Sequence, residues 1–167
     1  MSQAPATASR NPEPARVSIA WRVFTAPTYL GLALIAIHVI DKLWPAAIWF
    51  TMPWKMVGWG PILLGGGLCA AGAGHFAKRR TTILPRHDSR VLVTTGVFRW
   101  TRNPMYLGMV LILVGVCVIA GSATVWLAPP LFVLVVDRVL IRAEERMLTE
   151  RFGDAYRAYG QQTRRWL

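Results

Sequence analysis

Residues 103–136 read NPMYLGMVLILVGVCVIAGSATVWLAPPLFVLVV and contain no Asp, Glu, Lys or Arg. A membrane-spanning helix needs roughly 20 apolar residues, with a range of about 17–25. This stretch is therefore long enough for two short spans, and Gly121-Ser122 is the expected turn between them. Pro104 suits the first turn of the first span, where a missing N–H costs nothing. Pro129-Pro130 predict a kink in the second span, because proline removes a backbone donor.

Two further uncharged stretches precede this one. They run from Val23 to Ile40 and from Met56 to Ala77. We therefore expect an all-α integral membrane protein: a mobile polar arm over 1–23, then a single membrane domain over 24–167. The expected spans are about 24–43, 56–77, 104–120 and 123–141, followed by an amphipathic cytoplasmic helix. Three glycines in the second span, Gly65-Gly66-Gly67, predict close packing against another helix.

The composition supports this fold class. The 167-residue chain is 54% hydrophobic and only 16% charged, whereas soluble domains carry about 25% charged residues. These values exclude a disordered chain and a coiled coil. Although the formal net charge is +11, we interpret the basic loop 78–102 as a contact with anionic membrane lipids and not as a nucleic-acid site. Cys69 and Cys117 stand singly in apolar spans and form no metal-binding pattern.

The distribution of bases predicts the orientation in the membrane. Most arginines and lysines lie in the loop 78–102 and after the last span, and the opposite side has little beyond Lys42 and Lys55. The positive-inside rule then places both termini and the long loop in the cytoplasm. We expect the bacterial inner membrane as the location.

Two groups of unusual residues flank the apolar hairpin on its cytoplasmic side. The segment Arg102-Asn103-Pro104-Met105-Tyr106 opens the third span, and Arg142-Ala143-Glu144-Glu145 follows the fourth. Because the two glutamates are adjacent, they lie about 100° apart on a helix and cannot face one point equally. The two groups are candidates for a shared site at the membrane surface.

The sequence here resembles a known family. Arg102-Asn103-Pro104-Met105-Tyr106-Leu107-Gly108, then Glu144-Glu145 and Phe152-Gly153-Asp154-Ala155-Tyr156, resemble the isoprenylcysteine carboxyl methyltransferases, whose outline the phospholipid N-methyltransferases share. The resemblance covers about 72–167. It implies a membrane methyltransferase that uses S-adenosylmethionine and methylates an amphiphilic or lipophilic small molecule or lipid, at a carboxylate, an amine or a thiol.

The resemblance also implies a cofactor site built from both segments. Its positions here are Arg90, Val91, Leu92, Val93, Phe98, Arg102, Asn103, Pro104, Met105, Tyr106, Glu144 and Glu145. The family has His where this chain has Arg90 and Asn103, and Tyr where it has Phe98. Asn103 can hydrogen-bond but cannot titrate, and it can also cap the third helix. A substrate-contacting arginine of the family falls on Arg138 or Arg142.

The chemistry of methyl transfer assigns roles to these groups. S-adenosylmethionine carries a sulfonium, an ammonium, a carboxylate and ribose hydroxyls, and a glutamate such as Glu144 can accept charge-assisted hydrogen bonds from the ammonium or the hydroxyls. A carboxylate acceptor needs no base, because its charge cancels that of the sulfonium in a water-poor cleft. An amine acceptor must lose a proton, and His75 is our candidate base.

Two other functions compete with this hypothesis. A membrane NADPH-dependent reductase of the sterol-reductase type has a similar Arg-x-Pro-x-Tyr ending, and its cofactor phosphate would suit the basic loop. The adjacent acids favour the sulfonium cofactor instead. A catalytically silent membrane adaptor would bind neither cofactor.

Overall fold

The computed structural model describes residues 19–45, 47–78 and 92–167, and the regular secondary structure in these ranges is helical. Its elements are α1 (Ile19–Leu43), η1 (Trp54–Gly58), α2 (Trp59–Lys78), η2 (Gly96–Arg99), α3 (Pro104–Ala120), η3 (Thr124–Leu127), α4 (Ala128–Val135), η4 (Val136–Ile141), α5 (Arg142–Phe152) and α6 (Asp154–Gln162). The elements from η3 to α5 form one continuous helical stretch, Thr124–Phe152. Within it η4 is a π-helix, which the sequence did not lead us to expect.

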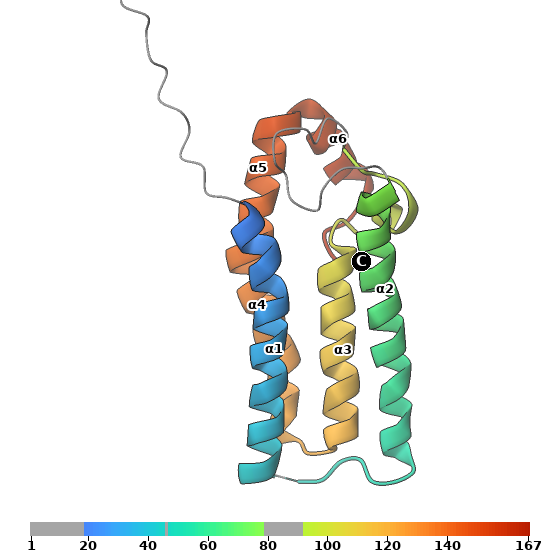
Figure 1. Ribbon diagram of the computed structural model, residues 1–167, viewed down its shortest axis with the longest axis vertical. Helices are drawn as coiled ribbons and strands as arrows, with labels where there is room; N and C mark the ends of the chain where they lie inside the picture. Colours follow the sequence, from blue (N-terminus) through green and yellow to red (C-terminus); the bar gives the residue numbers. More distant parts are fainter. Residues whose placement is uncertain (1–18, 46, 79–91) are drawn as a thin grey trace, which may run out of the picture.

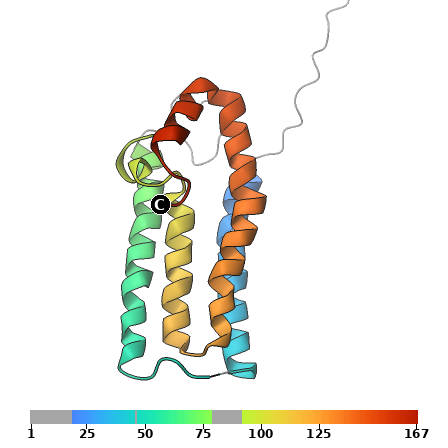
Figure 2. The same ribbon diagram turned by 180° about the vertical axis from the view of Figure 1, so that it is seen from behind.

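The long helices form an up-and-down bundle. In both views α2 runs beside α3, and α1 beside α4 (Figures 1 and 2). In the described part of the chain, three helical stretches are long and apolar enough to cross a membrane, over Ala26–Leu43, Trp54–His75 and Thr124–Phe152. The shorter apolar helix α3 has the expected bounds. The all-α prediction is therefore confirmed.

Two helix starts differ from the prediction. α1 begins at Ile19, so residues 19–23 belong to the helix and not to the polar arm, whose residues 1–18 lie outside the described ranges. Pro129 and Pro130 lie in the first turn of α4, directly after η3. They therefore lie at the junction of η3 with α4, where a missing N–H is tolerated, and the kink stays a prediction.

Small residues bring α2 and α3 close together. A Cβ on Gly65 would overlap the carbonyl oxygen of Gly108, and a Cβ on Gly108 would overlap that of Gly65. Gly66 and Gly67 face open space, so one of the three predicted glycines makes the close contact. The backbones of α2 and α3 can approach because neither helix has a side chain at this point.

The ends of the bundle differ in character. At one end Gly121, with φ of 88°, ends α3 and forms the predicted turn with Ser122. Lys55 Nζ closes that end by donating a hydrogen bond of 2.8 Å to the carbonyl of Ala120. At the other end α5 and α6 turn back over the bundle, and the C-terminus lies beside the ends of α2 and α3 (Figures 1 and 2).

The outward faces of the long helices are apolar. Leu63 and Leu64 on α2, and Leu131 and Leu134 on α4, are exposed. The side chains that fill the interior, such as the fully buried Leu113, are apolar as well. A helix that is apolar all round is typical of a membrane span. The polar side chains that a reaction needs are therefore expected at the end of the bundle that carries α5 and α6.

Candidate active site

The two motif segments meet at the polar end of the bundle. Tyr106 lies in the first turn of α3, and its Oη donates a hydrogen bond of 3.3 Å to Oε2 of Glu144 in the first turn of α5. Both side chains are half-buried. Residues 38 positions apart in the chain thus share one place, as the two-part motif predicted.

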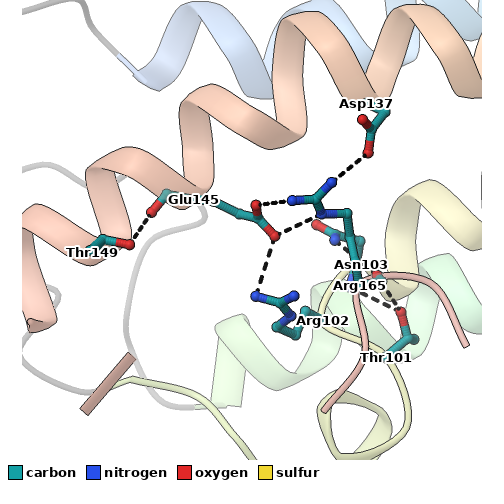
Figure 3. Close-up of polar contacts among 7 residues, drawn as sticks. All are labelled: Thr101, Arg102, Asn103, Asp137, Glu145, Thr149 and Arg165. Atoms are coloured by element: carbon teal, nitrogen blue, oxygen red, sulfur yellow. Dashed lines mark hydrogen bonds and ion pairs between the residues drawn. The ribbon is translucent and has the colours of Figure 1, made fainter. Parts of the chain in front are cut away.

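Glu145 faces a different set of partners (Figure 3). Arg165 binds its carboxylate in a bidentate manner, with Nε donating to Oε1 at 3.0 Å and Nη2 donating to Oε2 at 2.6 Å. Arg102 Nη1 lies 3.3 Å from Oε1 of the same carboxylate. Planar bidentate pairs of arginine and carboxylate are among the stronger ionic contacts. Glu145 therefore serves as an anchor for two arginines, which leaves Glu144 as the better candidate to face a cofactor.

The C-terminal residues 163–167 lie on the turn before α3. The carbonyl of Arg165 accepts hydrogen bonds from Thr101 Oγ1 at 3.1 Å and from Asn103 Nδ2 at 3.0 Å. One residue earlier, the carbonyl of Arg164 accepts from the backbone N–H of Arg102 at 3.0 Å. The side chain of Asn103 therefore ties down the C-terminal tail. Asn103 occupies the N-cap position of α3, as expected, but its side chain makes no capping bond to that helix.

The loop before α3 packs under α6. The hydroxyl of Tyr159 donates to the carbonyl of Phe98 at 2.7 Å, and burial raises the pKa of Tyr159 to about 12. Burial, followed by the negative charge of Glu145, also raises the pKa of Tyr156. Both phenols are therefore neutral donors near pH 7. Phe98 is itself buried and takes a structural position beneath the site.

His75, the candidate base, lies on the α2 side of that loop. Its Nδ1 is 3.0 Å from the carbonyl of Ala71. The ring meets Phe98 edge-on with centroids 6.3 Å apart, and it packs so closely on Gly96 that a Cβ there would overlap it. Gly96 has φ of 67°, a conformation that glycine adopts at no steric cost. His75 therefore has a polar contact within α2 and packing contacts with the loop, and its role as a base stays a prediction.

The two candidate arginines differ in their surroundings. Both residues are exposed, but Arg142 Nε lies 3.6 Å from Oδ2 of Asp137. Arg142 also lines a polar hollow of about 510 Å³ beside α5. The residues that line this hollow are Arg142, Glu145, Arg146, Thr149, Glu150 and Arg165. Arg142 thus contacts the ion-pair cluster around Arg165, and the choice between Arg138 and Arg142 as the substrate contact stays a prediction.

The remaining predicted positions lie around the same turn. Val93 is buried and Leu92 is half-buried. Pro104 is buried, and the carbonyl of Met105 accepts a bond from Cys69 Sγ at 3.3 Å. Arg90 and Val91 lie outside the described residues. Four residues of the cluster were not among the sequence candidates, namely Thr101, Asp137, Tyr156 and Arg165. Tyr156 belongs to the motif that carries the resemblance, but no role was assigned to it. Nothing in the local sequence distinguishes Thr101, Asp137 and Arg165, whose contacts join segments far apart in the chain.

The polar groups of the cluster fit a zwitterionic, hydroxyl-bearing cofactor. Glu144 supplies a half-buried carboxylate that can accept from an ammonium or a ribose hydroxyl. Arg102 Nε is buried and has no hydrogen-bond partner within the described ranges. A buried N–H normally has an acceptor, so Arg102 Nε could donate to an oxygen of a bound molecule. The two groups complement the ammonium and the carboxylate of S-adenosylmethionine.

Comparison with known proteins agrees with the motif. A family model described as phospholipid methyltransferase matches residues 54–155, a range that includes Arg102, Tyr106, Glu144 and Glu145. The chain is also 43% identical over 63 residues to an uncharacterized protein of Haemophilus influenzae, and this match covers all of that protein and 38% of the chain. No solved structure matches the chain.

Proposed function

We propose a function that starts from one fact: the chain belongs to the phospholipid methyltransferase family, because the family model matches more than half of the residues of the chain. It is accordingly an integral membrane protein of a methyltransferase family. We propose further that it transfers a methyl group from S-adenosylmethionine to an amphiphilic or lipophilic acceptor. Its location would be the bacterial inner membrane, with both termini in the cytoplasm.

The contact between Tyr106 and Glu144 is the observation that carries this proposal. It joins the two parts of the motif at the polar end of an otherwise apolar bundle. S-adenosylmethionine, when bound, supplies an electrophilic methyl group on a sulfonium. Glu144 would accept from the ammonium or the ribose hydroxyls of the cofactor, and Tyr106 would orient that carboxylate. Arg102 Nε, which is buried and has no partner among the described residues, would donate to an oxygen of the same molecule.

The acceptor would reach the site from the bilayer. The helices around the site expose apolar side chains along their length, so an acyl or prenyl chain could lie against them while its polar end reaches α5. Arg142, which is half-exposed and lines the polar hollow, is our candidate for contact with that end. Alignment of the two reactants would supply much of the rate enhancement, for which model reactions give about 7–11 kcal/mol.

Cofactor binding and methyl transfer test the proposal directly. The purified full-length protein in lipid nanodiscs is titrated with S-adenosylmethionine and with NADPH by calorimetry. It is then incubated with methyl-labelled S-adenosylmethionine and a lipid extract, or with a panel of lipophilic acids, amines and thiols. We expect binding of S-adenosylmethionine and a labelled product. Binding of NADPH alone would indicate the reductase, and binding of neither cofactor would indicate the adaptor.

A paired substitution tests the role of Glu144. Glu144→Gln keeps the size of the side chain and removes its charge, and we expect about tenfold weaker binding, because a charge-assisted hydrogen bond contributes about 1.5–3 kcal/mol. Asp154→Asn on α6 is the control, since its carboxylate is 95% exposed. Transfer at the full rate by Glu144→Gln would remove Glu144 from the site.

A further inference from the structure

We propose that Arg165 is a positioning residue that clamps the start of α5 to the turn before α3 and so holds Glu144 against Tyr106. The inference rests on the proposed function, because it concerns the same cofactor site. Arg165 lies beyond the residues 54–155 that the family model matches. Its role is therefore an inference from this chain's own geometry.

The side chain of Arg165 holds two carboxylates at once (Figure 3). Its Nε and Nη2 grip both oxygens of Glu145, and its Nη1 donates to Oδ1 of Asp137 at 3.2 Å. The hydrogen bonds to Glu145 raise the pKa of Arg165 further, so the guanidinium is charged throughout the physiological range. The planar fork of arginine matches a carboxylate in a way that lysine cannot.

The backbone of Arg165 holds the other half of the site. Its carbonyl accepts from Thr101 and Asn103, which directly precede Pro104 at the start of α3. One residue therefore ties α5 through its side chain and the turn before α3 through its carbonyl. The bond between Tyr106 and Glu144 joins the same two segments.

The contacts of Arg165 also connect the π-helix η4 with α5. Asp137 lies in the first turn of η4 and Glu145 in the first turn of α5, so the two acids flank the C-terminal part of the π-helical segment. A π-helix has wider i→i+5 hydrogen bonding than the α-helix and commonly marks a functional site. By bridging the two acids, Arg165 fixes the rotation of α5 relative to α4. Glu144 adjoins Glu145, so its direction is set by the same bridge.

Other arginines would preserve the fold without Arg165. Arg102 also contacts Glu145, at 3.3 Å, and Arg142 contacts Asp137, at 3.6 Å. Each acid therefore keeps one cation when Arg165 is substituted. We therefore expect substitution of Arg165 to misplace the Glu144 side chain without unfolding the protein.

Binding by three single variants tests the clamp. Arg165→Gln removes both the positive charge and the planar guanidinium group, whereas Arg165→Lys keeps the charge but not the guanidinium group. Arg164→Gln is the matched control, because the Arg164 side chain is exposed. In purified full-length protein we expect affinity for S-adenosylmethionine to fall about tenfold in Arg165→Gln. It should fall by less in Arg165→Lys, and Arg164→Gln should match the unmodified protein.

Two further measurements separate positioning from stability. Hydrogen–deuterium exchange without cofactor should quicken over 101–106 and 137–145 in Arg165→Gln and not in Arg164→Gln. If Arg165 acts through Glu145, the double variant of Arg165→Gln and Glu145→Gln should bind no more weakly than the weaker single variant, because the losses are coupled.

The outcomes distinguish this inference from the proposed function. If Arg165→Gln binds S-adenosylmethionine with unchanged affinity, even at a lower melting temperature, Arg165 has only a structural role and the clamp is wrong. If the unmodified protein does not bind S-adenosylmethionine, the proposed function fails. In that case, unchanged exchange over 101–106 and 137–145 in Arg165→Gln would overturn the clamp as well, and faster exchange would support it.

Discussion

At the scale of single residues, the adjacent acids Glu144 and Glu145 have separate partners. Adjacent side chains on an α-helix diverge by about 100°. Glu145 turns toward Arg165 and Arg102, and Glu144 toward Tyr106. The pair therefore combines an anchor for the C-terminal tail with a carboxylate for the proposed cofactor.

Tyr106→Phe should weaken the proposed cofactor site and leave the fold intact. The substitution removes the hydroxyl that donates to Glu144 and keeps the packing of the ring. A hydrogen bond to a charged group contributes about 1.5–3 kcal/mol, so we expect about tenfold weaker binding of S-adenosylmethionine by calorimetry. Tyr29→Phe on α1 is the control. Equal binding by both variants would show that the Tyr106 hydroxyl does not orient Glu144.

The contact between Tyr106 and Glu144 could be predicted from the sequence, but the role of Glu145 could not. The motif includes both glutamates, and helical geometry predicts only that their side chains point in different directions. What separates them is the position of Arg165, which belongs to a tail that we interpreted only as a source of positive charge. A distant partner of this kind leaves no local pattern.

At the scale of elements, the close packing of α2 on α3 makes two glycines unequal. Gly108→Ala would drive a Cβ into Cys69 and the carbonyl of Gly65, whereas a Cβ at Gly66 meets open space. Overpacking costs about 1–3 kcal/mol, and replacing glycine by alanine inside a helix gains about 0.5–1 kcal/mol. We therefore expect a lower melting temperature for Gly108→Ala and an unchanged or higher one for Gly66→Ala. Equal melting temperatures would contradict the packing.

The junction of α6 with the loop before α3 should be sensitive to alkali. Tyr159 ionises near pH 10 in the unfolded chain and at about 12 in the folded protein. Between these values the folded protein keeps a proton that the unfolded chain loses, so stability falls as pH rises from about 10 to about 12. Below pH 10 this contribution is constant.

Tyr159→Phe tests that dependence. The variant should lose about 1 kcal/mol at neutral pH, because the bond to Phe98 disappears. It should also show a smaller alkaline fall in melting temperature than the unmodified protein. Tyr156, whose pKa is also raised, would supply the remainder. An identical fall in both proteins would mean that Tyr159 does not titrate in this way.

The helices were predictable where apolar runs decide them. The bounds of α3 follow from Pro104 at its start and Gly121 after its end, both of which have backbone properties that no other residue shares. The π-helix η4 was not predictable, although its segment Val136–Ile141 contains the charged Asp137 and Arg138, because nothing in the sequence pattern distinguishes i→i+5 from i→i+4 hydrogen bonding. Its hydrogen bonding depends on contacts that the whole fold supplies.

At the scale of the whole molecule, polar chemistry and positive charge gather at one end of the bundle. The motif segments, α6 and the C-terminal arginines lie together there. In the described ranges, the opposite end carries Lys42 and Lys55, and Lys55 binds the carbonyl of Ala120. The site and the topology signal therefore share one side of the membrane. In the proposed orientation, a donor synthesised in the cytoplasm could reach the site without crossing the bilayer.

This arrangement gives a test of orientation in intact cells. Leu167→Cys places a thiol at the arginine-rich end and Trp54→Cys at the other, and both residues are exposed. The native Cys117 is buried and Cys69 is half-buried within an apolar helix. A membrane-impermeant maleimide should label Trp54→Cys in intact spheroplasts, and Leu167→Cys only after the membrane is opened, because positive segments stay in the cytoplasm. Labelling of Leu167→Cys in intact spheroplasts would place the site on the outer side, where no cytoplasmic donor could reach it.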